Sequence, residues 1–419
     1  MEEDSRILDK INSQLNEFCG RISEGLSKSK KRFIYQVVFG IQASRDVKLS
    51  EVSRSLEEEI RLIKTENRLS RNMSAQGLSE HINERLIRQG AVRIDKDMVL
   101  GLDLTAIEKP YAKKMDYLAT VWDGLKKEKV RGYWGLEVVG ANISDNYVLP
   151  LYGELYSCDA DGFESENKQI LKAIDTVNAQ AKGKGIWVMD RGGDRKELIN
   201  SILSKDLRFI IRMKLQRLLT LGNNQEKPAQ EVADKFIDYA YAYDLEIDNQ
   251  GVKEKRKVFL GTKRVKINGV EKELMLVAIK GFSDKPMLLL TNAVKPAAII
   301  LEMYLTRWKV EESIRFLKQE YGLKDVRVRN YESLKNTMAL LSAVFYFLSV
   351  YLGRKLKLSI LIKKICEKAK RFFQIPAFNQ YALADGIHRL MFNVKWVDPF
   401  KRDLVRKCDK QLALGFMRV

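Results

Sequence analysis

The spacing of apolar residues changes near residue 98 and separates a helical part of the chain from a mixed part. Before that point apolar residues recur at three- and four-residue spacing, as in Ile7, Ile11 and Leu15. This period is typical of amphipathic helices that pack into a bundle. We therefore expect residues 1–95 to form a helical domain.

One segment of the helical part has the pattern of half a helix-turn-helix motif. This segment is Leu49–Leu56, and basic residues such as Arg61, Lys64 and Arg68 follow it. Basic side chains on such helices reach DNA phosphates. We interpret residues 1–95 as a DNA-binding domain, and an ordinary small helical bundle is the alternative.

After residue 98 short apolar runs alternate with helical segments. The expected order is strands at 98–104, 133–139 and 147–156, a helix at 166–181, a strand at 185–189, a helix at 195–204 and a strand at 207–213. Three strands, helix, strand, helix and strand match a ribonuclease-H-like α/β core. We therefore expect the α/β fold class and a catalytic domain over residues 96–322.

A β-rich insertion is expected to interrupt this core at about residues 215–285. Its expected strands lie at 239–247, 256–260, 264–267 and 274–279. The pair Asn268-Gly269 is a hairpin signal between the last two strands. A long helix is expected from Ala297 to Tyr321, and residues 323–419 are expected to form a helical, basic C-terminal region.

Charge is the unusual feature of the composition. Lys plus Arg number 74 against 55 Asp plus Glu, so the formal net charge is +19. A field this positive attracts polyanions, of which nucleic acid is the commonest. The partner we expect is therefore DNA, and an anionic membrane surface is the competing interpretation.

Membrane insertion and histidine or cysteine chemistry are disfavoured by the sequence. The longest apolar run, Met338–Leu352, falls short of the roughly 20 residues of a spanning helix, and the acidic start has no signal-peptide pattern. We therefore expect no membrane partner and a location in the bacterial cytosol or nucleoid. Two histidines and four widely spaced cysteines suggest neither a zinc site nor a histidine-activated nucleophile. Any chemistry falls to carboxylates, together with a hard metal ion.

Two single carboxylates follow apolar strands. Asp103 ends the run that starts at Met98, and Asp190 follows the strand at 185–189. Burying an unpartnered carboxylate is costly, so two at strand ends suggest a shared cation. The alternative is that each side chain only caps a turn.

A third acid stands among basic residues in the long helix. Tyr304, Arg307, Glu311, Arg315 and Lys318 are separated by 3, 4, 4 and 3 residues, which places them on one helical face. A solvated helix with Glu–Arg pairs would look similar, at ~0.3–0.5 kcal/mol for each pair. The functional interpretation is a metal-binding carboxylate between phosphate-binding cations.

The pattern Y-x2-R-x3-E-x6-K, present as Tyr304, Arg307, Glu311 and Lys318, resembles the signature of the DDE transposases of the insertion-sequence-four family. Asp103 and Asp190 lie where that family places its first two acids, and the family also has an insertion before the glutamate. The resemblance covers about residues 95–350.

This resemblance implies that the chain cuts transposon ends and joins them to target DNA, cut-and-paste through a hairpin intermediate. Asp103, Asp190 and Glu311 would be the catalytic and metal-binding residues for two Mg²⁺ ions, for which Mn²⁺ can substitute. Arg307, Arg315 and Lys318 would contact DNA phosphates. Tyr304 would stack or hydrogen-bond near the scissile link. A homodimer would form in the synaptic complex.

The sequence departs from the family pattern at two places. Gly193-Asp194 follow the Asp-x-Gly turn where an aromatic residue is common, and the insertion lacks the tryptophan that stabilises a flipped base in some relatives. Five aromatic residues could replace it: Phe236, Tyr239, Tyr241, Tyr243 and Phe259.

Two other functions remain compatible with the sequence. Another ribonuclease-H-like nuclease, such as a resolvase, would use the same acids without needing the Tyr-Arg-Glu-Lys signature. A catalytically silent, transposase-derived DNA-binding protein is the second, although all three acids are present.

Overall fold

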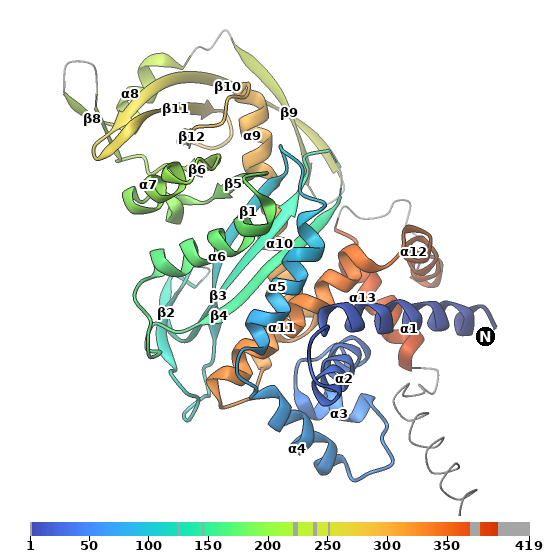
Figure 1. Ribbon diagram of the computed structural model, residues 1–419. Helices are drawn as coiled ribbons and strands as arrows, with labels where there is room; N and C mark the ends of the chain where they lie inside the picture. The colour runs from blue at the N-terminus through green and yellow to red at the C-terminus, as the bar shows by residue number, and fades with distance from the viewer. Residues whose placement is uncertain are drawn as a thin grey trace, which may run out of the picture.

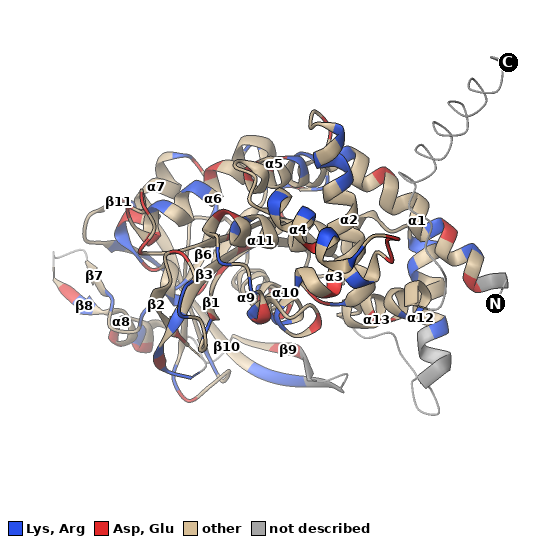
Figure 2. Ribbon diagram, turned by 90° about the horizontal axis from the view of Figure 1, so that it is seen from below, with Lys and Arg blue, Asp and Glu red and all other residues tan. Residues whose placement is uncertain are grey.

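The computed structural model describes residues 2–124, 126–144, 146–220, 225–237, 241–249, 252–368 and 378–392. A long mixed sheet occupies one side of the molecule, and helices from both ends of the chain gather on the other (Figure 1). Basic residues are spread over both parts, along strand β10 (Val252–Ile267) as well as on the helices (Figure 2).

The first part of the chain is helical, as expected. Its helices are α1 (Glu2–Ile22), α2 (Lys28–Ser44), α3 (Leu49–Ser55), α4 (Leu62–Met73) and α5 (Leu78–Ala91). Helix α5 packs against strand β4 (Val148–Tyr156). The Asn83 side chain also donates to the Gly153 carbonyl of that strand, at 3.0 Å. The helical part and the sheet therefore share one apolar core.

The centre of the sheet contains the strands expected after residue 98. They are β1 (Val99–Glu108), β3 (Glu128–Ala141), β4, β5 (Ile186–Met189) and β6 (Phe209–Arg212), with the additional β2 (Ala119–Asp123) paired to the first residues of β3. In the sheet β4 pairs with β3, and β3 is followed by β1, β5 and β6. Strand β3 runs antiparallel to β1, whereas β1, β5 and β6 are parallel.

The register of the parallel pair brings the first two candidate acids to one place. Gly101 pairs with Val188, so Asp103 and Asp190 each come two residues later on neighbouring strand paths. Our expectation that Asp103 ends its strand is wrong, because β1 continues to Glu108 along β3. Asp103 nevertheless lies just beyond the last residue of β1 that pairs with β5.

Two helices of the mixed α/β part of the chain lie beside the candidate acids. They are α6 (Glu166–Ala181), whose N-cap Ser165 accepts from the Lys168 amide, and α7 (Lys196–Ser204). Both form where 3.6-residue periodicity predicts them. The short 3-10 turn Arg191–Gly193 connects β5 to the start of α7.

The insertion is β-rich and extends the same sheet. It comprises β7 (Leu218–Thr220), β8 (Glu226–Pro228), α8 (Ala229–Phe236), β9 (Ala242–Asn249), β10, β11 (Val270–Lys280) and β12 (Met287–Thr291). Strand β12 pairs with β6, which rejoins the core. The hairpin turn is found, with Gly269 at φ +75°. The strands expected at 256–260 and 264–267 are one strand, because β10 pairs with β11 across that gap.

The long helix expected from Ala297 to Tyr321 is two helices. Helix α9 (Ala297–Thr306) and helix α10 (Trp308–Glu320) meet at Arg307. The Arg307 amide donates to the Tyr304 carbonyl, at 3.1 Å, so the junction makes a tighter turn than the α-helix. Helix α10 crosses β1 and β3.

The C-terminal part is helical as far as it is described. It contains the 3-10 turn Leu323–Asp325, α11 (Tyr331–Tyr346), the π turn Phe347–Tyr351, α12 (Arg354–Lys368) and α13 (Gln380–Phe392). Residues 369–377 and 393–419 of the expected C-terminal region lie outside the described residues. Among the described helices one stretch, Tyr331–Tyr351, is long and apolar enough to cross a membrane, but its apolar window is 89% buried inside the fold, as in a core helix.

Contacts between the two ends of the chain hold the far end of α10. Arg45, after α2, pairs with Glu320 at 2.6 Å and with Asp385 of α13 at 2.9 Å. The Val47 amide donates to the Tyr321 carbonyl at 3.0 Å. The C-terminus of α10 is therefore fixed by residues from both termini of the described chain.

Candidate active site

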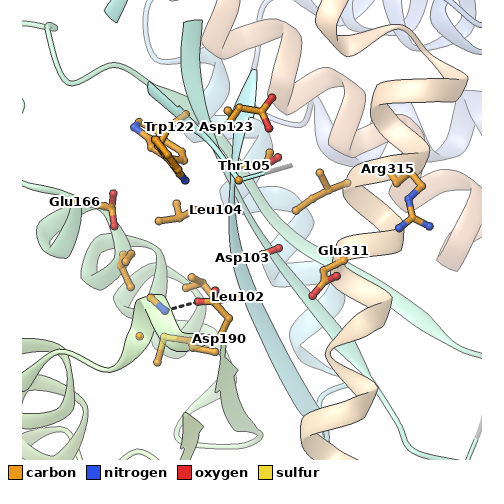
Figure 3. A pocket seen from close by; sticks show the side chains of 18 of the residues that line it. Leu102, Asp103, Leu104, Thr105, Trp122, Asp123, Glu166, Asp190, Glu311 and Arg315 are labelled. Carbon is orange, nitrogen blue, oxygen red and sulfur yellow. Dashed lines mark hydrogen bonds between the residues drawn. The ribbon is translucent and has the colours of Figure 1, made fainter. Parts of the chain in front are cut away.

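A cavity of about 850 Å³ opens where β1 and β5 face the start of α10. Asp103 from β1, Asp190 from the end of β5 and Glu311 from α10 all line it (Figure 3). Figure 3 shows Asp103 and Glu311 extending toward the same space, with Asp190 on the side of α6 and α7. Three acids that are far apart in sequence thus share one cavity.

Asp103 is the least exposed of the three acids, with 20% of its side chain accessible. Burial raises the pKa of Asp103 to about 7; the Arg307 guanidinium opposes this rise, and the charges of Asp190 and Glu311 add to it. The charges of Asp190 and Glu311 are therefore close enough to act on Asp103.

Asp190 is positioned by the turn that follows β5. Its Oδ1 accepts from the Gly192 amide at 2.7 Å, and the side chain caps the short 3-10 turn. The two glycines of the turn leave no room for larger residues, because a Cβ on Gly192 would lie 2.9 Å from Asp190 Oδ1 and one on Gly193 2.7 Å from Met189 Cβ. The glycine at 193, which departs from the family pattern, thus has a local steric reason.

Glu311 lies in the first turn of α10 and is 46% exposed. Its Oε1 accepts from Arg307 Nη2 at 2.5 Å, and Arg307 Nη1 lies 3.9 Å from Asp103 Oδ1. Arg307 therefore faces two of the three acids at once. Its own side chain is only 11% exposed.

Tyr304 lies beneath Arg307 and does not line the cavity. The residue is 4% exposed, and the Arg307 guanidinium carbon stands 5.5 Å from its ring centroid. Its buried hydroxyl has no hydrogen-bond partner among the described residues. The geometry is that of a support for Arg307, and a direct contact of Tyr304 with DNA stays a prediction.

Two other basic residues of α10, Arg315 and Lys318, line the cavity. Lys318 Nζ donates to Thr105 Oγ1 and, at 3.0 Å, to the Ala106 carbonyl, both on β1. Burial and the nearby Lys324 lower the pKa of Lys318 to about 8. Arg315 is 57% exposed and pairs with Glu312.

Several residues that line the cavity or lie next to its acids are absent from the set expected from the sequence. Glu137 does not line the cavity, but it pairs directly with Asp103 across the β1–β3 ladder and is 4% exposed. Burial raises the pKa of Glu137 to about 8. Trp122 on β2 lines the cavity and is 51% exposed, and Glu166 and Arg195 also line it. Finding them required the strand register and the packing of helices that are distant in sequence.

The aromatic residues of the insertion that were expected to stabilise a flipped base are only partly described. Tyr241 is 48% exposed, and the Tyr243 hydroxyl donates to Glu302. Phe236 and Phe259 pack against the apolar core. Tyr239 lies outside the described residues.

The chemistry of the three acids fits a hard divalent cation. Carboxylate oxygens are the ligands that such ions prefer, and a cation would offset both the burial of the Asp103 charge and its repulsion by Asp190 and Glu311, which raise the pKa of Asp103. In the described part of the chain, however, no three Asp, Glu, His or Cys side chains are grouped closely enough to hold a metal ion. Glu311 is instead turned to Arg307.

Residues 148–348 match a family described as "Transposase DDE domain", a span that contains Asp190 and Glu311 but not Asp103. No curated protein matches the chain. One similar solved structure is a "piggyBac transposase synaptic complex with hairpin DNA", at 12% identity and a TM-score of 0.43, over 96% of this chain and 82% of that one.

Proposed function

We propose that this protein is a DNA transposase of the DDE type, in the insertion-sequence-four family, which cuts transposon ends and joins them to target DNA. The observation that carries the proposal is the single cavity into which Asp103, Asp190 and Glu311 open. The match of residues 148–348 to a transposase DDE domain supports it independently. Basic side chains around the acids suit a phosphodiester substrate.

We further propose that the centre of the sheet is a ribonuclease-H-like core. The strand order β4-β3-β1-β5-β6, with β3 antiparallel to the parallel strands β1, β5 and β6, supports this assignment. The β-rich insertion between β6 and β12 then places α10 back across β1. This return is what brings Glu311 to the two aspartates.

Asp103, Asp190 and Glu311 would hold two Mg²⁺ ions, which, when bound, activate the attacking oxygen and stabilise the leaving one. The protein's own basic residues would orient the DNA. Arg307 faces Asp103 and Glu311 and offers a planar fork to a phosphate. Lys318 keeps its charge at neutral pH, because its lowered pKa of about 8 is still above 7.

Several finer features belong to the same proposal. The released 3′-hydroxyl would attack the opposite strand to give a hairpin end, and two copies of the chain would hold the two ends together. Residues 1–95 would contribute end recognition. The protein would act in the bacterial cytosol or nucleoid.

The test is a cleavage assay on a DNA fragment that carries the terminal repeats flanking this protein's own gene. Asp103→Asn, Asp190→Asn and Glu311→Gln should each abolish Mg²⁺-dependent cutting and leave end binding largely intact. Glu312→Gln is the matched control, because Glu312 is the next residue of α10 and pairs with Arg315 instead. Substantial cutting by any of the three variants would remove that residue from the site. Cutting by the wild type without joining would favour a nuclease such as a resolvase.

A further inference from the structure

The wall of the cavity opposite α10 contains a basic residue that the family signature does not include. Arg195 is the N-cap residue of α7, and its side chain is 33% exposed. It donates to Asn167 Oδ1 at 2.8 Å and forms an ion pair with Glu166, in the first turn of α6. Glu166 is visible on that wall, across the cavity from Glu311 (Figure 3).

The position of Arg195 is distinct from that of the other lining cations. Among the described residues, the cations that line the cavity are Arg195, Arg315, Lys318 and Lys324. The last three come from one short stretch of chain, in α10 and the turn after it. Arg195 is the cation on the side of Asp190, so it extends the positive charge to both sides of the acids.

We infer that Arg195 binds a backbone phosphate of the DNA strand that occupies the cavity, and that Asn167 holds its guanidinium in place for that contact. The inference rests on the proposed function. A guanidinium has five N–H donors, so two bonds to Asn167 and Glu166 leave donors for a phosphate oxygen. Before DNA binds, Glu166 neutralises the charge of Arg195, and a phosphate competes with it for the same cation.

The alternative role is purely structural, since the Arg195–Glu166 pair also joins the starts of α6 and α7. The protein provides a matched control for this alternative. Lys205, the C-cap residue of α7, pairs with Asp175 of α6. That pair joins the same two helices, but neither of its residues lines the cavity.

The experiment measures DNA dissociation constants as a function of salt for four variants of the full chain. Arg195→Ala should weaken binding roughly tenfold and reduce the slope of log affinity against log salt by about 0.9, the value for one phosphate contact. Arg195→Lys should restore the slope and leave cleavage impaired, because the charge remains and the fork is lost. Glu166→Gln should tighten binding, because the competing carboxylate is removed. Lys205→Ala should leave the slope unchanged.

Replacing a single DNA phosphate by an uncharged group can show which phosphate Arg195 contacts. A single methylphosphonate, moved along the strand near the cleavage site, should weaken wild-type binding at one phosphate that Arg195→Ala no longer senses. The inference would be overturned by equal slopes for Arg195→Ala and Lys205→Ala together with weaker binding by Glu166→Gln. The Arg195–Glu166 pair would then serve only to join the starts of α6 and α7. Failure of the wild type itself to cut DNA would instead count against the proposed function.

Discussion

Removing the charge of Asp103 should stabilise the metal-free protein, and the size of the gain should depend on pH. Burial raises the pKa of this carboxyl from 3.8 to about 7. Each unit of pKa shift corresponds to about 1.36 kcal/mol. A shift of about 3 units therefore gives roughly 4 kcal/mol at pH values above 7 for Asp103→Asn, before any change in packing.

The sign follows from which state holds the proton. Below the unfolded-state pKa both states are protonated and the carboxyl contributes nothing. As the pH rises toward 7, the unfolded chain ionises first while native Asp103 keeps its proton, so the wild type loses stability. The advantage of Asp103→Asn should therefore grow between pH 5 and 7 by roughly 2 kcal/mol and stay constant above pH 8.

The assay is urea unfolding of both proteins at pH 5, 6, 7 and 8 in the presence of a chelator. Asp97→Asn is a control of opposite sign, because hydrogen bonding from Lys295 lowers the pKa of Asp97. Its loss of stability should be the same at all four pH values, because the unfolded and the lowered native pKa of Asp97 both lie below pH 5. A difference between Asp103→Asn and wild type that does not vary with pH, or a less stable variant at pH 8, would refute the reasoning. Mg²⁺ should narrow the difference by stabilising the wild type alone.

Four other outcomes are expected. Arg307→Lys should fold normally yet be impaired on pre-cut as well as intact transposon ends, because the charge remains and the planar fork does not; normal strand transfer would show that Arg307 is structural. Gly101→Val should push α10 away from β1, since even a Cβ there would lie 3.4 Å from Val310, and cleavage by this variant at the wild-type rate would contradict that packing argument. For the wild type, the logarithm of DNA affinity should fall against the logarithm of salt concentration at a slope of about −0.9 for each contacted phosphate. Arg61→Ala should reduce end-specific binding if the helical part recognises the ends.

The arrangement of elements was largely predictable because it follows from local periodicity. The helix at 166–181, the strand after it and the hairpin turn at Gly269 all lie where side-chain spacing and turn chemistry place them. The ends of strands that are set by pairing with a neighbouring strand could not be predicted. Strand β1 runs on to Glu108 because β3 pairs with it, and no local signal marks that continuation.

The residues of the candidate site also divide into those that local sequence patterns reveal and those that only the fold brings together. The acids could be found from sequence because a carboxylate after an apolar run and a glutamate among basic residues are local patterns. The helix break at Arg307 was missed, because neither a proline nor a glycine marks it. Glu137 and Arg195 were missed because their place near the acids depends on strand register and helix packing.

The anchoring of α10 by both termini has a consequence for synthesis on the ribosome. Arg45 is translated early, but its partner Asp385 emerges some 340 residues later. Closing a contact of such long sequence separation is slow and leaves apolar surface exposed in the meantime. A nascent or prematurely terminated chain that ends before residue 378 would contain all three acids yet lack α13, which helps to hold the helix of Glu311. Under the proposed function, cleavage would then begin only after α13 has been translated.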